Sequence, residues 1–368
     1  VYSDIGRVTK LNKNKTIAVV GCVAQAENSE MFNKNSNIDI VLGPQSYHLL
    51  PKMIYDSEQN KTKLINTDFI INEKFDYITE EKDSKGVSSA ITIQEGCDKF
   101  CSFCVVPFTR GPEYSRYFND IKLEAESVSI RGASEIILLG QNVNAYNYSY
   151  RGKNYSISYL INLISEIEKV KRIRYTTSHP INMSDELIHL HAENKKLMPF
   201  LHLPVQSGSD QILKKMNRKY NSYDYRKIIE KLKKSNPDIE ISSDFIVGYP
   251  GETEAHVEEL LSFITDYPFA HIGCFAYSDE HGTRSARLGN KVPQDVIQDR
   301  IQRVMDHQYE LVSKRNQEKI GKSYECLYEG NGQARTAHEA PDVDGSVFIL
   351  NADALVPGQF YTVKVVSA

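Results

Sequence analysis

Strand-like and helix-like segments alternate between residues 88 and 277, and this alternation limits the folds open to the chain. The strand-like segments are short, apolar and rich in β-branched residues; they lie at residues 88–96, 134–142, 172–180, 199–206, 239–248 and 269–278. Helical periodicity separates most of them; it is visible at 120–133, 156–170, 222–235 and 252–266, and after Ser184, a residue typical of a helix N-cap. Six strands each followed by a helix predict a parallel α/β sheet, closed or partly closed into a barrel. Active sites of barrel folds lie at the C-terminal ends of the strands.

A cluster of three cysteines directly follows the first of these strands. Cys97, Cys101 and Cys104 stand at Cys-x3-Cys-x2-Cys, with Phe100 and Phe103 between them. Thiolates at this spacing can each hold a corner of a [4Fe–4S] cluster, which leaves one iron without a protein thiolate. An open iron can bind the amino and carboxylate groups of S-adenosylmethionine (SAM) and pass it one electron, chemistry that belongs to the cofactor. We expect the two phenylalanines to shield the cluster by local burial.

A zinc ion is the alternative occupant of the cysteine loop, with a fourth ligand such as His202. The placement of all three cysteines after the first strand of a predicted barrel favours the cluster. Cys274 and Cys326 lie in strand-like patterns and are predicted to be buried thiols.

The pattern of strand-like, helical and charged segments changes on both sides of the predicted barrel. Residues 1–78 contain strand-like segments at 15–25 and 38–44, typical of part of a smaller α/β domain, and residues 79–87 form a charged linker. The barrel region, 88–320, ends in one long helix predicted at 293–320. Residues 321–368 contain short β-rich segments between Gly and Pro turns, which predict a small β domain, complete or not.

The composition limits the compartment in which the protein can act and the partners that it can bind. The chain has 368 residues, 40% of them hydrophobic, and no apolar run long enough for a membrane span. Its start lacks the basic-then-apolar order of a secretory signal, and clustered cysteines favour a reducing compartment, so we expect a cytoplasmic protein. The net charge of −4 gives no global bias toward nucleic acid, so any RNA contact must be local.

The cysteine motif resembles the signature of the radical-SAM superfamily, and the wider pattern is similar to the methylthiotransferase family. The segments that carry the resemblance are "AVVGCVAQAE" (18–27), "IDIVLGPQ" (38–45), "EGCDKFCSFCVVPFTRG" (95–111), "ILLGQNVNAY" (137–146), "RYTTSHP" (174–180), "FLHLPVQSGSD" (200–210) and "SSDFIVGYPGETE" (242–254). Together they cover nearly the whole chain. The resemblance implies a partial radical-SAM (β/α)6 barrel between an N-terminal α/β domain, here truncated, and a small C-terminal β-barrel of the TRAM type. It also implies SAM and a SAM-binding [4Fe–4S] cluster on the three cysteines.

The family's N-terminal domain supplies three cysteines to a second [4Fe–4S] cluster, which carries the sulfur to be inserted. Cys22 matches the third of these, and the other two would lie before Val1. Neither Cys274 nor Cys326 stands where it could substitute. We therefore expect the second cluster only where the missing N-terminal cysteines are present. The chain as given is expected to cleave SAM without completing methylthiolation.

Two parts of the chain resemble different members of the family. Residues up to about 250 are similar to the members that methylthiolate isopentenyl-adenosine beside the tRNA anticodon. Segments 271–283 and 336–349 are closer to the members that methylthiolate an aspartate β-carbon on a small-subunit ribosomal protein.

The charge of the C-terminal segment also bears on the choice between tRNA and a ribosomal protein as the substrate. From Lys322 onward three basic residues stand against six acidic ones; the basic residues are Lys322, Arg335 and Lys364, and the acidic ones are Glu325, Glu329, Glu339, Asp342, Asp344 and Asp353. A tRNA-holding module should be basic, whereas an acidic one suits a basic ribosomal protein. We expect tRNA as the substrate, because the barrel holds the atom to be modified. The ribosomal protein is one alternative, and a SAM-cleaving or binding protein without sulfur transfer is another.

Polar residues near the expected site have two interpretations each. Gln141 and Asn142 end the second strand and could reach the SAM ribose or the substrate, or could cap a loop. Arg110 and Arg116 could pair with the SAM carboxylate or an RNA phosphate, or form surface ion pairs.

Residues that follow the later strands also have two interpretations each. Ser207 could offer its backbone N–H to an anion or act as a helix N-cap. Gly248 and Glu252, in "GYPGE", resemble the family's turn near the SAM adenine, or shape the turn alone. We expect a monomer and a reductase that supplies electrons.

Overall fold

The computed structural model describes residues 1–368 except 12–14, 70–74, 76–85, 268 and 342–344. Most of the predicted linker at 79–87 therefore lies outside the described residues. In the part of the chain that is described, none of the helices combines the length and the apolar character needed to span a bilayer.

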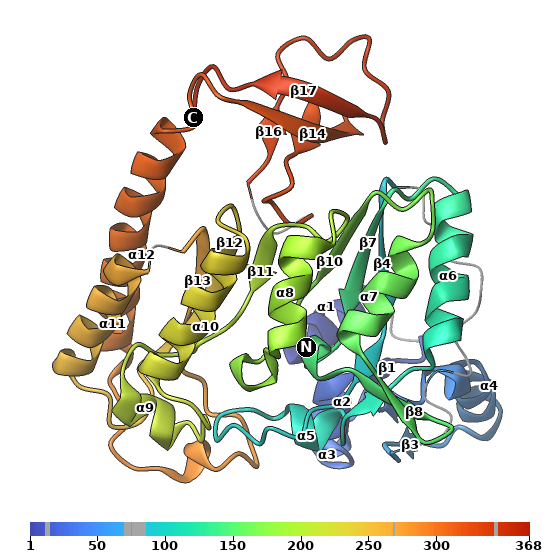
Figure 1. Ribbon diagram of the computed structural model, residues 1–368. Helices are drawn as coiled ribbons and strands as arrows, with labels where there is room; N and C mark the ends of the chain where they lie inside the picture. The colour runs from blue at the N-terminus through green and yellow to red at the C-terminus, as the bar shows by residue number, and fades with distance from the viewer. Residues whose placement is uncertain (12–14, 70–74, 76–85, 268, 342–344) are drawn as a thin grey trace.

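Six parallel strands form the centre of the molecule. They are β4 (Ser88–Thr92), β7 (Glu135–Leu139), β10 (Arg172–Tyr175), β11 (Phe200–His202), β12 (Glu240–Val247) and β13 (His271–Ala276). The first three pair in the order β10-β7-β4 and the last three in the order β11-β12-β13, always in parallel. A parallel bridge between Ile173 and Leu197 connects the two halves, and Figure 1 shows them as one curved wall. The predicted partial barrel is confirmed.

Helices cover the outer face of this wall. They are α6 (Phe118–Ile130), α7 (Ile157–Ser165), α8 (Asp185–Glu193), α10 (Ser222–Ser235), α11 (Glu254–Asp266) and α12 (Gln294–Gln317). The core between helices and strands includes the fully buried side chains of Ile91, Leu138 and Ile173. Each such side chain stabilises the fold by about 1.5–3 kcal/mol relative to an exposed one. The predicted N-cap is also confirmed, because the Leu187 N–H donates to Ser184 Oγ at 3.1 Å.

Shorter elements cluster near the C-terminal ends of the barrel strands. They are β5 (Gln94–Glu95), α5 (Val106–Thr109), β6 (Tyr114–Ser115), η2 (Val143–Ala145), β8 (Asn147–Tyr150), β9 (Lys153–Ser156), η3 (Pro180–Asn182), α9 (Asp210–Lys215) and η4 (Ser285–Arg287). In Figure 1, α5, α9 and β8 lie at the same end of the molecule.

The N-terminal part is a small α/β unit. Its parallel sheet has the order β1-β2-β3, with β1 (Ala18–Val20), β2 (Ile40–Leu42) and β3 (Leu64–Asn66); its helices are α1 (Tyr2–Leu11), α2 (Cys22–Glu27), α3 (Glu30–Lys34), η1 (Tyr47–Leu49) and α4 (Leu50–Asn60). The strand predicted at 15–25 is wrong in its second half. Gly21 has φ +103, which ends the strand, and the good helix formers Ala and Gln then continue as α2.

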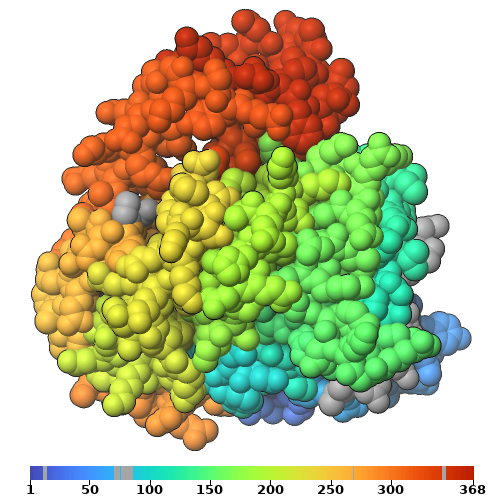
Figure 2. Space-filling view, viewed as in Figure 1, coloured from blue at the N-terminus to red at the C-terminus, as the bar shows by residue number. Residues whose placement is uncertain are grey.

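The C-terminal part is a four-stranded antiparallel sheet of order β16-β15-β14-β17. The strands are β14 (Ser323–Gly330), β15 (Gln333–Arg335), β16 (Val347–Phe348) and β17 (Phe360–Lys364). Among the described residues, the strand pairings do not close this sheet into a barrel. In Figure 2 it forms a lobe, in red, at the opposite end of the molecule from the cyan segment that contains α5. The C-terminal domain therefore stands at the end of the barrel away from the cysteine loop.

Candidate functional site

The three clustered cysteines lie in one loop beyond the C-terminal end of β4. Cys97, Cys101 and Cys104 are partly buried and unpaired. Gly96 precedes them with φ +81, and a Cβ at this position would lie 2.0 Å from the Pro112 carbonyl oxygen. The turn into the loop therefore requires glycine.

Ser102, between the second and third cysteines, joins this loop to the chain after α9. Its N–H donates to the Met216 carbonyl at 2.9 Å and its hydroxyl to the Lys215 carbonyl at 2.9 Å. The same hydroxyl lies 2.8 Å from the Tyr249 hydroxyl. Ser102 and Tyr249 are both buried, so these bonds fix the loop against the ends of the later strands.

Arg218 places a cation beside the loop. Its NH1 group donates to Cys101 Sγ at 3.3 Å, while its other nitrogens donate to the Tyr220 hydroxyl and the Pro204 carbonyl, each at 2.6 Å. The residue is only 8% exposed. A buried guanidinium thus lies in hydrogen-bond contact with the sulfur of the second loop cysteine. Sequence reasoning missed Arg218, because nothing local marks it.

Burial raises the pKa values of the two outer cysteines of the loop. It raises the pKa of Cys97 to about 11, and it also raises the pKa of Cys104. These thiols therefore keep their protons at neutral pH unless a metal displaces them, and metal binding releases those protons.

The zinc alternative finds no support in the described part of the chain. There, no group of three or more His, Cys, Asp or Glu residues is arranged to hold a single metal ion. The proposed fourth ligand is engaged elsewhere: His202 Nδ1 lies 2.8 Å from Ser242 Oγ, and its Nε2 lies 3.3 Å from Asp244 Oδ2. Three free cysteines in one loop are the donor set of a [4Fe–4S] cluster that leaves one iron without a protein thiolate.

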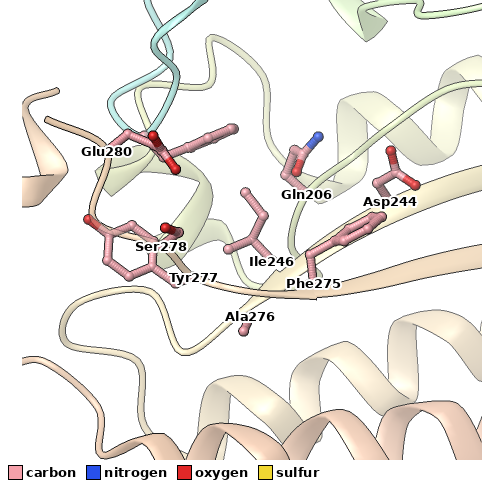
Figure 3. Close-up of a pocket in the computed structure, with 9 residues that line it drawn as sticks. Gln206, Asp244, Ile246, Phe275, Ala276, Tyr277, Ser278 and Glu280 are labelled. Atoms are coloured by element: carbon pink, nitrogen blue, oxygen red, sulfur yellow. The ribbon is translucent and has the colours of Figure 1, made fainter. Parts of the chain in front are cut away.

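A cavity of about 210 Å³ adjoins the loop at the C-terminal ends of β12 and β13. Its lining comprises Phe103, Gln206, Asp244, Ile246, Phe275, Ala276, Tyr277, Ser278 and Glu280, and Figure 3 shows eight of these residues labelled around it. Carboxylate, amide and hydroxyl groups alternate there with aromatic rings. Such a lining suits a ligand with both polar and aromatic parts.

The two loop phenylalanines differ in their surroundings. Phe103 lines the cavity and packs against Ile212, Met216 and Tyr249. Phe100 is 55% exposed, so its predicted burial is wrong. The reason is local: Phe100 has φ +48, and its ring packs edge-on against the Phe108 ring at the surface.

Gln141 and Asn142 lie beside the loop and contact protein groups. Gln141 Oε1 accepts the Gly96 N–H at 2.8 Å, the bond expected of a loop-capping amide. Asn142 is buried and donates to Glu113 Oε1 at 2.8 Å. Contact of either side chain with SAM or substrate stays a prediction.

Gln94, which sequence reasoning missed, organises this region. Its Oε1 accepts the N–H groups of Gln141 and Asn142, each at 3.0 Å, and its Nε2 donates to the Gly96 carbonyl at 2.7 Å. The side chain is fully buried. The available signal was an amide at the end of the apolar run "AITIQ".

Ser207 is not a helix N-cap. The helix α9 begins at Asp210 after the N-cap Ser209, and Ser207 Oγ accepts the Ser209 N–H at 3.2 Å. Binding of an anion by the Ser207 N–H stays a prediction.

Gly248 and Glu252 form a buried turn. Glu252 Oε1 accepts the Gly248 N–H at 2.8 Å and Arg300 NH1 at 3.0 Å, and burial raises the pKa of this carboxyl. A Cβ at Gly248 would lie 2.4 Å from the Ile297 side chain of α12. These contacts support the turn-shaping interpretation, and contact with the SAM adenine stays a prediction.

Cys22, from the N-terminal unit, lies next to the segment that follows the cysteine loop. Arg110 Nε donates to Cys22 Sγ at 3.2 Å, and Arg110 NH1 donates to Glu95 Oε1 at 2.8 Å. Cys22 therefore stands at the same end of the barrel as the three clustered cysteines.

The remaining arginine and cysteines lie in structural contacts. Arg116 is buried, donates to Glu124, and does not form the surface pair considered from sequence. Cys326 is buried as predicted. Cys274 is partly buried, and burial raises its pKa to about 12.

Comparison with known proteins agrees with this geometry. The family model described as the Radical SAM superfamily matches residues 91–264, and the one described as the TRAM domain matches residues 320–368. Among solved structures, the chain is similar in fold to the cobalamin-dependent S-adenosylmethionine radical enzyme OxsB with aqua-cobalamin and SAM bound. The TM-score is 0.50 at 13% identity, and the match covers 85% of this chain and 46% of OxsB. The fold and the cysteine loop define a radical-SAM protein, a class that uses a [4Fe–4S] cluster and SAM.

Proteins of similar sequence show to which family within this class the chain belongs. The chain is 45% identical over its whole length to the tRNA-2-methylthio-N(6)-dimethylallyladenosine synthase of Wolbachia pipientis subsp. Culex pipiens (strain wPip), and the match covers 85% of that protein. It is 48% identical to the protein of the same name from Pelagibacter ubique (strain HTCC1062), with 89% of this chain and 74% of that protein covered. The chain belongs to the family of tRNA-2-methylthio-N(6)-dimethylallyladenosine synthases, and the predicted methylthiotransferase membership is confirmed.

Proposed function

We propose that this protein adds a methylthio group to isopentenyl-adenosine (dimethylallyl-adenosine) in tRNA. The observation that carries the proposal is the 45% identity over the whole chain, joined to a three-cysteine loop at the C-terminal end of the barrel. The loop and the fold alone would not suffice, because many radical-SAM proteins share them without sharing a substrate.

The residues of the loop have distinct roles in this proposal. Cys97, Cys101 and Cys104 hold a [4Fe–4S] cluster, which when bound supplies the electron for SAM cleavage. Arg218 donates to Cys101 Sγ and holds its position, and Ser102 keeps the loop in place against the later strands. The cavity lined by Phe103 is the proposed place of SAM.

Cys22 is proposed as a ligand of the second [4Fe–4S] cluster. Its support is position, because Arg110 joins Cys22 to Glu95, two residues before the first cysteine of the loop. The sulfur carrier and the SAM site would then face each other across the same end of the barrel.

The ribosomal-protein alternative has two grounds, the resemblance of segments 271–283 and 336–349 and the acidic charge of the C-terminal segment. The second can be compared with the structure. Arg335 of that segment bonds Glu135 and Ser88, the first residues of β7 and β4, so the segment stands at the N-terminal ends of the strands. Its charge therefore lies far from the cysteine loop and has little effect on the atom to be modified. The tRNA substrate is favoured for this reason.

Product analysis tests the proposal. The 368-residue chain and a form extended at its N-terminus by a segment with two further cluster cysteines are each reconstituted anaerobically with iron and sulfide, then incubated with SAM, a reductant and isopentenylated tRNA or the small-subunit ribosomal protein. We expect 5′-deoxyadenosine from both proteins and methylthio-adenosine in tRNA from the extended form. Methylthio-aspartate instead would favour the alternative substrate, and SAM cleavage with neither product would favour an enzyme without sulfur transfer.

Electron supply, assembly and location complete the proposal. A separate reductase is proposed as the electron donor, because cleavage of SAM at the cluster consumes an electron that has to be supplied to it. We propose a monomer in the cytoplasm, where thiols remain reduced.

A further inference from the structure

The hairpin formed by β8 and β9 extends the barrel at its active-site end. It follows Asn142 and η2, and the Asn147 N–H donates to Ser115 Oγ at 3.0 Å. Ser115 lies in β6, which pairs with β5 immediately before Cys97. Figure 1 shows β8 at the same end of the molecule as α5. The hairpin is thus close in the fold to the cysteine loop.

Aromatic contacts hold the hairpin in a fixed position. The Tyr117 ring centroid lies 5.1 Å from that of Tyr148 and 5.5 Å from that of Tyr150, and Phe118 lies 4.5 Å from Tyr155. Such ring pairs each contribute about 0.5–1.5 kcal/mol beyond the area they bury. An isolated two-stranded hairpin is only marginally stable, so these rings against the start of α6 keep it rigid.

The outward face of the hairpin is polar and carries positive charge at the turn. Asn147, Ser149 and Asn154 are exposed, as are Arg151 and Lys153 at the turn. Between Glu135 and Glu166 the sequence has no acidic residue, and its basic residues are Arg151 and Lys153. Two acidic groups act on the hairpin in the described part of the chain, Asp120 on Tyr148 and Glu186 on Ser156, and the residues they act on lie near its base.

We infer that the β8–β9 hairpin contacts the phosphate backbone of the RNA beside the base to be modified. This inference rests on the proposed function. Two cations with amide and hydroxyl donors around them match phosphodiester oxygens, which receive most of the contacts in protein–nucleic acid interfaces. The same positive charges would repel a basic ribosomal protein. The acidic C-terminal domain stands at the other end of the barrel, so RNA near the site needs cations from the rim.

The turn itself allows a clean test. Arg151 has φ +50 and Gly152 has φ +74, the pair of positive values that a type I′ turn requires. Asn tolerates this conformation better than Arg does. The double variant Arg151→Asn with Lys153→Gln therefore removes both charges and keeps the turn. Arg151→Lys with Lys153→Arg keeps the charge, and Lys227→Gln with Lys234→Gln removes two exposed charges from α10 as a matched control.

The experiment measures binding of the 368-residue chain to an anticodon stem–loop RNA carrying dimethylallyl-adenosine, over a series of salt concentrations. We expect the neutral hairpin variant to bind on the order of tenfold more weakly, with a log–log salt slope smaller by roughly 1.5. The charge-keeping and α10 variants should bind like the original chain. SAM cleavage without RNA should be the same in all four proteins.

The outcomes separate the two proposals. If the original chain binds the RNA and the neutral hairpin variant binds it equally well, the hairpin inference is wrong and the proposed function stands. Equal losses in the hairpin and α10 variants would also overturn it, because the effect would then be one of net charge. If the original chain does not bind this RNA at all, the proposed function fails and the inference fails with it.

Discussion

The guanidinium of Arg335, in the C-terminal domain, lies 2.5 Å from the carboxylate of Glu135 at the start of barrel strand β7. Glu135 is fully buried and Arg335 is 2% exposed, and Arg174 bonds the other oxygen of the same carboxylate at 2.7 Å. One buried carboxylate thus joins two arginines from different domains. Together with the bonds from Arg172 and Arg174 to backbone carbonyls of residues 335–337, this contact joins the C-terminal domain to the barrel.

Removing the arginine should destabilise the junction between the two domains. Arg335→Met leaves Glu135 with one cation in a buried site, where loss of a partner costs about 3–5 kcal/mol. Arg303→Met is the matched control, because Arg303 pairs with Glu254 and Glu258 at the surface and such pairs contribute about 0–1 kcal/mol. The thermal unfolding midpoint of each variant measures the difference. Equal midpoints for the two variants would contradict the structural importance of the buried pair.

The same carboxylate predicts a pH dependence. Burial alone would raise the pKa of Glu135, but Arg174 and Arg335 lower it to about 2. A carboxyl with a lowered pKa stabilises the fold above the pKa of the unfolded chain, near 4.5, and this stabilisation is lost as pH falls through about 2. It amounts to roughly 3 kcal/mol. Glu135→Gln lacks this dependence, so its midpoint should lie below that of the original chain at pH 6 and approach it near pH 2.5.

The three loop cysteines should be equally necessary for SAM cleavage. Changing Cys97, Cys101 or Cys104 to Ala removes one of the three thiolates that hold the cluster, and 5′-deoxyadenosine production should fall below detection. Cys274→Ala is the control, since this partly buried thiol lies outside the loop. Iron content is measured in parallel. Continued 5′-deoxyadenosine production in a loop variant would remove the cluster assignment.

The strands and the cysteine loop could be predicted because their signals are local. A β-branched run, a helical period and a Cys-x3-Cys-x2-Cys spacing can each be read within about ten residues. The error at α2 is local too: the apolar run from Ile17 continues in sequence through Cys22, but the backbone turns at Gly21. Residue pattern alone does not report that φ angle.

The partners of the loop could not be predicted, because they come from distant parts of the chain. Arg218 is 117 residues from Cys101, and Gln94 is 47 residues from Gln141. Only the closure of the barrel brings these pairs together. The pattern of a single sequence indicates which face of a helix or strand is buried, but it does not indicate which helices and strands contact each other.

Gly96 should be required for cluster loading without being required for folding. In Gly96→Ala the new Cβ would overlap the Pro112 carbonyl oxygen at 2.0 Å, and φ +81 is unfavourable for alanine. The loop must shift, so we expect iron content and SAM cleavage to fall at least tenfold while the circular dichroism spectrum is unchanged. Gly289→Ala, where no atom lies within 4 Å, should load iron normally. Full iron loading in Gly96→Ala would show that the loop tolerates the shift.

Arg218 should tune the cluster that the loop holds. A positive donor 3.3 Å from Cys101 Sγ withdraws electron density from the sulfur and favours the reduced cluster. Arg218→Met removes this charge but keeps much of the side-chain volume, so the reduction potential should become more negative. Arg218→Lys should return part of the difference, although lysine cannot also bond Tyr220 and Pro204 with the same geometry. Electron paramagnetic resonance during a redox titration measures the potential independently of turnover. An unchanged potential in Arg218→Met, with iron content intact, would limit Arg218 to a structural role in the buried chain around Pro204.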